Sequence, residues 1–298
     1  MSEDYNNREK MTSKRKPRFR WRQLFAIMAG IFIILFIALL ISVISLRWVN
    51  PSFTAFTIRE DWAALEAERY NLREYWTNSE ELPDHLIWAV IASEDQRFWE
   101  HRGLDFYAIE EALEERRRGE SQRGASTITQ QVAKNLYLSP AESFFRKGIE
   151  AGIAIFIEIF WPKERIIEIY LNIVEFGPGM FGIGKASSEL FHKTPRQLLP
   201  DESARLAAVL PSPKRMRVEP PSPFAYERSQ WILRQMRQLT GVSYVPETDT
   251  TEQLNEDVPF PAEPDFPDLR DTLHVTDDSL LWDDISDSLL NSEWEIYN

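Results

Sequence analysis

One stretch of 23 residues without a charged side chain, Leu24 to Leu46, constrains this chain more than any other feature of its sequence. It is rich in Ile, Leu and Phe. As a helix rising 1.5 Å per residue it would reach about 34 Å, enough to cross the hydrocarbon core of a bilayer. A cleaved signal peptide has a shorter apolar run that ends in small residues, whereas Arg47 and Trp48 follow this one. The sequence therefore predicts an uncleaved membrane anchor over residues 24–46.

The orientation of that anchor is predicted from the charges before it. Positively charged flanks stay in the cytoplasm, which places the basic arm, residues 1–23, inside and everything after Arg47 outside. The arm signals topology and is not expected to bind a ligand. Its eight basic residues are Arg8, Lys10, Lys14, Arg15, Lys16, Arg18, Arg20 and Arg22.

The net charge of −13 belongs almost entirely to the C-terminal segment. Residues 241–298 hold 16 acidic residues and one basic residue, whereas residues 1–240 are nearly balanced. This composition predicts a disordered acidic tail over 241–298. Its "SLLWDDISDSLL" run is either inert or a docking motif for a partner protein. No basic field suggests binding to nucleic acid.

Cysteine and histidine usage excludes several classes of site. The chain has no cysteine, so it has no disulfide framework, thiolate nucleophile or cysteine metal site. Its four histidines are scattered, with no pair at metal-ligand spacing. We expect neither a zinc enzyme nor any protein-held metal.

Residues 47–240 are expected to form one mainly α-helical domain, because apolar residues recur at three and four and β-alternation is scarce. In its first predicted helix, which starts near Asp84, Glu94 falls near the middle of an apolar stripe about 140° wide at roughly 100° per residue. Asp95 should point to the polar side, and His101 joins the stripe if the helix continues. The apolar members of the stripe are Leu86, Ile87, Val90, Ile91 and Phe98.

Glu94 is therefore a candidate catalytic acid. A carboxylate on an apolar face loses hydration, so its pKa tends to rise, which suits proton transfer near neutral pH. The alternative is a structural Glu94 paired with Arg97 or Arg102.

A second candidate acid, Glu150, lies in "RKGIEAGIAIFIEIFW", residues 146–161. This run is apolar nearly all round from Ile149 to Phe160, so we expect a buried helix that Pro162 ends. A buried carboxylate needs a partner, and Arg146 can reach Glu150 along one helix face. The alternative is a buried salt bridge without catalytic function.

The segment between these acids, "GASTITQQVAKN", is rich in hydrogen-bond donors. Ser126 or Thr127 is expected to cap the next helix. The polar set Gln130, Gln131 and Lys134 suits sugar hydroxyls or phosphate oxygens, or it forms a solvated helix start.

Two motif matches are rejected. "GPGMFG", residues 177–182, fits G-x-G-x-x-G but follows a predicted helix without a surrounding βαβ unit. One S-x-x-K, Ser13 to Lys16, lies in the basic arm without a K-T-G partner, so a penicillin-binding transpeptidase site is absent.

The ordered motifs of residues 47–239 resemble glycosyltransferase family 51, the peptidoglycan glycosyltransferases, and most closely its monofunctional biosynthetic transglycosylases from Gram-negative bacteria. "EDQRFWEHRG" fits E-D-x-x-F-x-x-H-x-G at Glu94, Asp95, Phe98, His101 and Gly103. "GASTITQQ" fits G-x-S-T-I-x-Q-Q at Gly124, Ser126, Thr127, Ile128, Gln130 and Gln131, with Lys134 and Asn135 behind it. "RKGIE" fits R-K-x-x-E at Arg146, Lys147 and Glu150, and "KERIIEIYLN" fits K-x-x-[IL]-[IL]-E-x-Y-L-N at Lys163, Glu168, Tyr170 and Asn172.

The resemblance implies a lysozyme-like, two-lobed domain with a membrane-facing jaw, in the inner membrane with its catalytic domain in the periplasm. It implies polymerisation of lipid II, in which the acceptor 4-hydroxyl attacks C1 of the donor and undecaprenyl pyrophosphate leaves with inversion. Glu94 would be the general base, and Glu150 would assist the donor pyrophosphate directly or through water or a metal. No cofactor is obligatory, although Mg²⁺ or Mn²⁺ could bind at the pyrophosphate. The remaining matched residues of the first three motifs would bind or order the substrate: Asp95, Phe98, His101, Gly103, Ser126, Thr127, Gln130, Gln131, Lys134, Asn135, Arg146 and Lys147.

One position departs from the family pattern. Close relatives carry an arginine four residues before the R-K pair, where this chain has Glu142. The reversed charge should weaken binding of the donor pyrophosphate unless one of Arg116 to Arg118 substitutes. Two other functions stay open: a lysozyme-like lytic enzyme, and a non-catalytic membrane scaffold that binds other cell-wall synthesis or division proteins.

Overall fold

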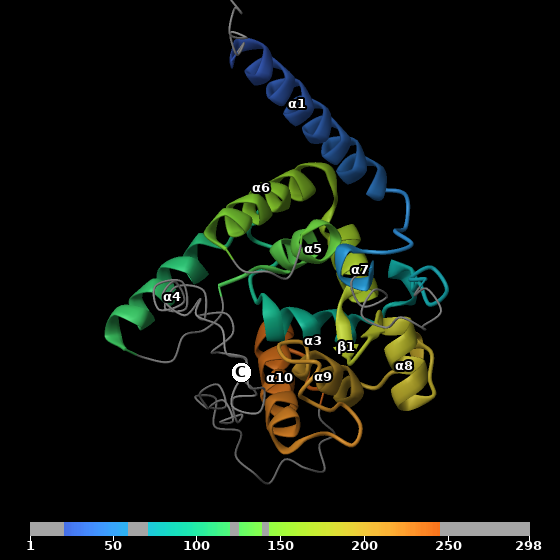
Figure 1. The fold of residues 1–298 in the computed structure, drawn as a ribbon. Coiled ribbons are helices and arrows are strands. Elements are labelled where there is room, and N and C mark those ends of the chain that lie inside the picture. The colour runs from blue at the N-terminus through green and yellow to red at the C-terminus, as the bar shows by residue number, and fades with distance from the viewer. Residues whose placement is uncertain (1–20, 59–70, 120–124, 139–142, 245–298) are drawn as a thin grey trace, which may run out of the picture. The chain divides into compact units, whose positions relative to one another are not determined.

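The computed structural model describes residues 21–58, 71–119, 125–138 and 143–244. Its secondary structure is mostly helical (Figure 1). The chain divides into two compact units, residues 1–42 and 43–298. The predicted tail, most of the basic arm, Gly124 and Glu142 lie outside the described residues. The helices are α1 (Trp21–Leu46), α3 (Asp84–Glu94), α4 (Phe106–Arg118), α5 (Ile128–Tyr137), α6 (Phe144–Phe160), α7 (Lys163–Ile173), α8 (Ile183–Phe191), α9 (Pro200–Ala208) and α10 (Pro223–Thr240).

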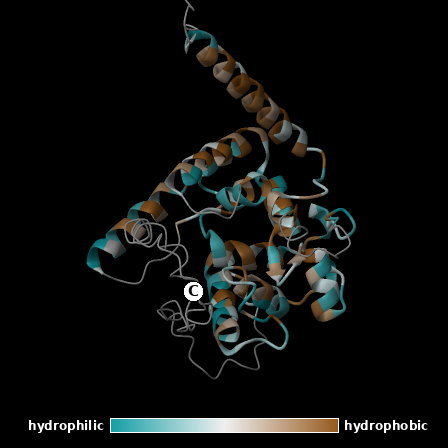
Figure 2. Cartoon of the chain, in the orientation of Figure 1, coloured by the Kyte–Doolittle hydropathy of each residue, from teal (hydrophilic) through white to brown (hydrophobic). Residues whose placement is uncertain are grey.

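The first unit contains most of α1, which has 26 residues and is apolar enough to cross a membrane. At 1.5 Å per residue it reaches about 39 Å. Figure 2 shows hydrophobic residues along nearly all of α1, and its large side chains are exposed, among them Phe25, Phe32 and Ile34. These features agree with the predicted single-pass anchor.

In the second unit two groups of helices carry the site. Helices α3, α9 and α10 pack together, and α5 packs on both α6 and α7. In Figure 1, α5 and α6 lie above α3 with α9 and α10 below it. The short 3-10 helix Ser79–Glu81 precedes α3, and the 3-10 helix Pro195–Gln197 lies between α8 and α9. The buried core residues include Leu86, Val90, Ile166, Ile169 and Ile232.

Proline and glycine fix several helix ends. Pro83 and Pro162 are the N-caps of α3 and α7, and α10 has Pro223 in its first turn. Proline suits these positions because the first amides of a helix have no intrahelical acceptor. Helix α10 ends at Gly241, whose φ of +71° is the left-handed conformation that glycine adopts without strain. Helix α6 ends at Phe160 before Pro162, as predicted.

The run "GPGMFG" lies in a small hairpin, not in a nucleotide-binding turn. Strands β1 (Glu175–Gly177) and β2 (Met180–Phe181) pair antiparallel, with Glu175 opposite Phe181. Gly182, with φ +85°, then begins α8. No βαβ unit is present in the described part of the chain.

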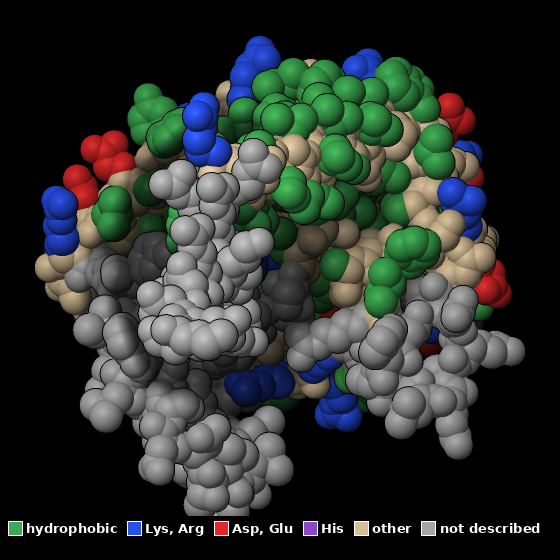
Figure 3. Space-filling view, turned by 45° about the horizontal axis from the view of Figure 1, so that its top comes forward, with side chains coloured by type: hydrophobic (Ala, Val, Ile, Leu, Met, Phe, Trp, Pro, Cys, Tyr) green, Lys and Arg blue, Asp and Glu red, His purple; other side chains and the backbone are tan. Residues whose placement is uncertain are grey.

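The expectation that α6 is buried all round was wrong. Ile153, Ala154 and Ile157 are buried against the protein. The other side of α6 exposes Phe145, Ile149, Ile155 and Ile159, and Figure 3 shows hydrophobic side chains covering much of the upper part of one face of the molecule. The side chains of an apolar helix avoid water, and sequence alone does not say whether protein or lipid surrounds them.

Candidate functional site

Glu94 is the last residue of α3, and its side chain is only 3% exposed. The Ser93 hydroxyl donates to Glu94 Oε1 at 3.0 Å, and the Gln131 amide donates to Oε2 at 2.9 Å. The Arg228 guanidinium lies 3.8 Å from Oε1. The alternative partners Arg97 and Arg102 were therefore wrong, since the ion pair of Glu94 in the described residues is with Arg228.

Tyr170 fixes which end of the Gln131 amide faces Glu94. Its hydroxyl donates to Gln131 Oε1 at 3.1 Å, so the amide nitrogen of Gln131 is the atom left to contact the carboxylate. Tyr170 is fully buried on α7. Glu94 thus accepts hydrogen bonds from α3 and α5 and lies 3.8 Å from a cation on α10.

Asp95 is buried, and the prediction that it points to the polar side was wrong. Helix α3 ends at Glu94, and Asp95 takes φ −161° and ψ 76°, so helical spacing no longer applies to it or to His101. Both Asp95 oxygens lie 2.9 Å from His101 Nε2, and Oδ2 accepts from the Ile128 amide at 3.0 Å. This contact joins the loop after α3 to the first turn of α5.

The start of α5 is capped as predicted by one of the two candidates, Thr127. Thr127 and Gln130 form a reciprocal capping box, and both are buried. The Thr127 hydroxyl also donates to the Gly103 carbonyl at 2.7 Å. Gly103 has φ +87°, and a Cβ there would lie 3.1 Å from the Ala154 carbonyl oxygen, so glycine is required for both reasons.

The remaining predicted residues lie in the loop after α3 and on α5. Phe98 is fully buried, and the Lys163 ammonium lies 4.3 Å from its ring centroid. Asn135 is buried on α5, and Lys134 beside it is half-buried. Seven of the predicted substrate-binding residues thus contact protein groups: Asp95, Phe98, His101, Gly103, Thr127, Gln130 and Asn135. Their role in substrate binding stays a prediction, and they would contribute to it by shaping the site.

Glu150 forms a second cluster on α6. Arg146 donates to Glu150 Oε2 at 2.8 Å, as the helical spacing predicted, and Lys147 donates to Oε1 at 2.9 Å. Glu150 is 1% exposed, whereas the Lys147 side chain is 31% exposed. Lys147 also donates to the Ser126 hydroxyl at 2.6 Å. The cluster carries a net charge of about +1.

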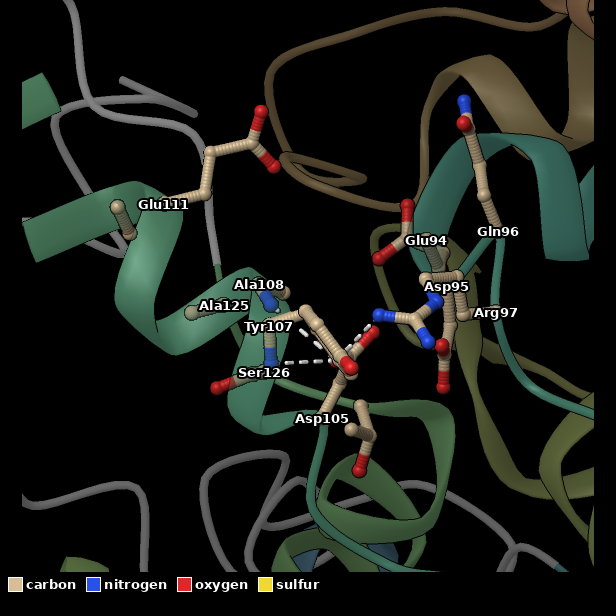
Figure 4. Close-up of a pocket in the computed structure, with 12 residues that line it drawn as sticks. Glu94, Asp95, Gln96, Arg97, Asp105, Tyr107, Ala108, Glu111, Ala125 and Ser126 are labelled. Atoms are coloured by element: carbon tan, nitrogen blue, oxygen red, sulfur yellow. Dashed lines mark hydrogen bonds and ion pairs between the residues drawn. The ribbon is translucent and has the colours of Figure 1, made fainter. Parts of the chain in front are cut away.

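Helix α5 and its cap connect the two acids. Gln131 contacts Glu94, and Ser126, two residues before α5, contacts Lys147. Glu94 and Ser126 also line one pocket (Figure 4). The pocket is bordered by the end of α3, the first turns of α4 and the segment before α5.

The α4 side of this pocket holds three residues that the sequence did not single out: Asp105, Tyr107 and Glu111. Arg97 lies over the Tyr107 ring, 4.2 Å from its centroid, and 3.5 Å from Asp105 (Figure 4). The hydrogen bond that Arg97 donates to Glu100 is the main reason that the pKa of Arg97 is raised. Glu111 also borders the pocket.

Arg228 and Tyr170 were missed as site residues. Tyr170 was within a matched motif, but no role followed from its spacing. Arg228 left a clearer signal, because it lies in the same helical stripe as the buried Ala225, Ile232 and Met236. An arginine in an apolar stripe needs a buried partner, but the sequence does not identify which one.

Comparisons with known proteins agree on one family. A family model described as Transglycosylase matches residues 62–237. A biosynthetic peptidoglycan transglycosylase of Shewanella oneidensis is 43% identical over 222 residues, which cover 74% of this chain and 95% of the relative. Proteins of the same name from Pseudomonas putida and Xanthomonas campestris are 45% and 43% identical, over 72% and 70% of this chain and 92% and 85% of those relatives.

Proposed function

This chain belongs to the transglycosylase family, and we propose that it polymerises lipid II into linear glycan strands with release of undecaprenyl pyrophosphate. It is a monofunctional peptidoglycan glycosyltransferase of cell wall synthesis. The observation that carries the site assignment is the position of Glu94. This acid lines a pocket, is shielded from water, accepts hydrogen bonds from α3 and α5 and lies 3.8 Å from a cation on α10.

Glu94 is assigned as the general base. The 4-hydroxyl of the acceptor sugar attacks C1 of the donor, its proton passes to a Glu94 oxygen, and the C1–O bond to the pyrophosphate breaks with inversion. The donors Ser93 and Gln131 each occupy one lone-pair direction and leave the carboxylate able to accept another hydrogen. General base catalysis of this kind contributes about 10²–10⁴-fold in rate.

The Glu150 cluster is assigned to the departing pyrophosphate. Its net positive charge and the half-buried Lys134 favour a group that gains negative charge as the bond breaks. Glu150 acts by holding Arg146 and Lys147 in place. Glu142, whose charge is expected to weaken binding of the pyrophosphate, lies outside the described segments.

No cofactor is obligatory in this scheme, and a divalent cation fits poorly on Glu150. Both of its oxygens already accept from cationic side chains, so a metal would have to displace one of them. In the described part of the chain no group of three or more acidic, histidine or cysteine side chains is placed to hold a metal. Mg²⁺ or Mn²⁺, where it takes part, enters with the pyrophosphate of the substrate.

A membrane lipid as substrate accounts for two apolar features. Helix α1 can anchor the chain, and the exposed apolar side of α6, on the helix that carries Glu150, suits contact with acyl or prenyl chains. The basic arm supports a cytoplasmic N-terminus and a periplasmic catalytic domain in the inner membrane. A partner among other cell-wall or division proteins is a further proposal, for which the acidic tail is the candidate contact.

The test is a polymerisation assay with labelled lipid II and the detergent-solubilised full chain, beside Glu94→Gln. Polymer from the wild type and a loss of at least about 10²-fold in Glu94→Gln are expected, with an unchanged circular dichroism spectrum. Activity in EDTA should persist if no metal is obligatory. Shortened strands in place of polymer would indicate a lytic enzyme, and a folded wild type that does neither would favour the scaffold.

A further inference from the structure

Arg228, on α10, is among the largest side chains that are fully buried in the described part of the chain. A guanidinium cannot lose its charge in a protein, so burying it is costly unless anions or strong acceptors face it. Two acceptors that face it, Ser93 and Glu94, are both on α3, far away in sequence. This side chain therefore lies behind the acid that lines the pocket.

The contacts form a short chain from Arg228 to Glu94. Arg228 NH2 donates to Ser93 Oγ at 3.0 Å, and the same nitrogen lies 3.8 Å from Glu94 Oε1. Ser93 Oγ lies 3.0 Å from Glu94 Oε1 and 3.3 Å from the Ala207 carbonyl. The hydroxyl has one hydrogen. Because Arg228 donates to its oxygen, that hydrogen is directed at one of these two acceptors, and Glu94 is the closer and the charged one.

We propose that Arg228 is a positioning residue for the proton-accepting carboxylate: it faces Glu94 with a positive charge at 3.8 Å and keeps the carboxylate aimed at the pocket, directly and through Ser93. The proposal rests on the assignment of Glu94 as the base. Arg228 is 0% exposed, so it acts through Glu94 and does not touch the substrate.

The physical need for such a cation follows from the burial of Glu94. An isolated carboxylate removed from water takes up a proton and is then useless as a base. Neutral donors such as Ser93 and Gln131 orient the group, and a cation within about 4–6 Å favours its charged form much more strongly.

The other charged groups around Glu94 do not supply this cation. On the pocket side lie Asp95, Asp105 and Glu111, which are acidic, and Arg97. The Arg97 side chain is 39% exposed and engaged with Glu100 and Asp105. The α5 side contributes the neutral Gln131. Arg228 is the cation that the described structure places within 4 Å of the Glu94 carboxylate.

A purely structural role would be to join α10 to α3, which pack together. Removing Arg228 would lower stability under either reading, so a loss of stability decides nothing. The two readings differ in the pH dependence of the rate. Loss of a nearby cation makes Glu94 easier to protonate, whereas loss of a mere packing contact lowers the rate equally at every pH.

The experiment measures initial polymerisation rates of labelled lipid II by the detergent-solubilised full chain from pH 5 to 9. Arg228→Met should move the acid limb of the profile to higher pH by about one unit or more, with much of the loss recovered at alkaline pH and KM for lipid II unchanged. Arg237→Met is the matched control, because Arg237 is exposed on the same helix. It should follow the wild-type profile.

A folded Arg228→Met protein with an unmoved acid limb and a uniformly lower rate would overturn the proposal. If Arg228→Met does not fold, Arg228→Lys decides: its shorter side chain should move the limb by less, in the same direction, and an unmoved limb overturns the idea. Glu94→Gln separates this from failure of the functional assignment. If Glu94→Gln keeps its activity, Glu94 is not the base, whatever Arg228 does.

Discussion

Replacing Glu150 by glutamine tests whether this acid works by holding two cations. In the native protein one oxygen accepts from Arg146 at 2.8 Å and the other from Lys147 at 2.9 Å. An amide of the same shape can accept from one of them but turns its NH₂ group toward the other. The local charge rises by about one unit, and one cation loses its partner.

The expected cost in stability is moderate. Removing one partner of a fully buried ion pair costs about 3–5 kcal/mol. Water reaches Lys147, whose side chain is 31% exposed, so we expect about 2–3 kcal/mol. For a domain of this size that corresponds to a Tm lower by roughly 4–12 °C.

Glu158→Gln is the matched control. Glu158 lies two turns further along α6, is also nearly buried, and accepts from Thr129 at 2.6 Å and Lys163 at 2.7 Å. It does not line the pocket that Glu94 lines. Glu158→Gln should therefore lower Tm by a similar amount and, at a temperature where it is folded, polymerise lipid II within about threefold of the wild-type rate.

Glu150→Gln should instead lose about 10²–10³-fold in kcat, the usual cost of removing one preorganised electrostatic group at a reacting centre. Tm by circular dichroism and initial polymerisation rates on the same preparations measure both quantities. The reasoning is refuted if the two variants lose the same Tm and polymerise at the same rate, because Glu150 would then be a structural acid like Glu158.

Two further predictions concern stability. Burial is the main reason that the pKa of His85 is lowered, and its contact with the Leu198 carbonyl and the nearby Asp84 and Glu202 offset this only in part. The unfolded chain therefore binds the extra proton more readily than the folded chain. The stability of the fold is then unaffected by His85 above about pH 6.5 and decreases as the pH falls below that value. The wild-type Tm should fall from pH 7 to pH 5 and that of His85→Gln should fall less; parallel curves would contradict this. Gly103→Ala should destabilise by about 2 kcal/mol or more by thermal unfolding, because φ is +87° and the new Cβ would lie 3.1 Å from the Ala154 carbonyl. Gly148→Ala on α6, whose Cβ would meet nothing within 4 Å, is the control that should leave Tm unchanged or raised.

Much of the fold was predictable because it depends on local rules. The apolar run before Arg47 indicated a spanning helix, and Pro162 separated α6 from α7 as expected. The error over the exposed side of α6 has a physical cause: lipid and protein interior select the same side chains. The error over Asp95 came from extending helical geometry past Glu94, where the helix in fact ends.

The site was predictable only in part. Glu150 and Arg146 are one helical turn apart, so their contact follows from spacing. Gln131 and Arg228, which contact Glu94 from α5 and α10, are far from it in sequence, so their contacts could not be inferred from residue spacing. The pocket wall from α4, with Arg97 stacked on Tyr107, likewise depends on how α4 follows the loop after Gly103.

The surroundings of the two acids also decide which of them can act as the base. Both oxygens of Glu150 accept hydrogen bonds from cations, so each oxygen is already engaged by a charged donor of the protein. The oxygens of Glu94 accept from a hydroxyl and an amide, and its cation stands off at 3.8 Å. Each oxygen of Glu94 thus has only a neutral donor at hydrogen-bond distance and can accept a further hydrogen from an alcohol in the pocket, so the two acids could not exchange roles even if the substrate reached both equally.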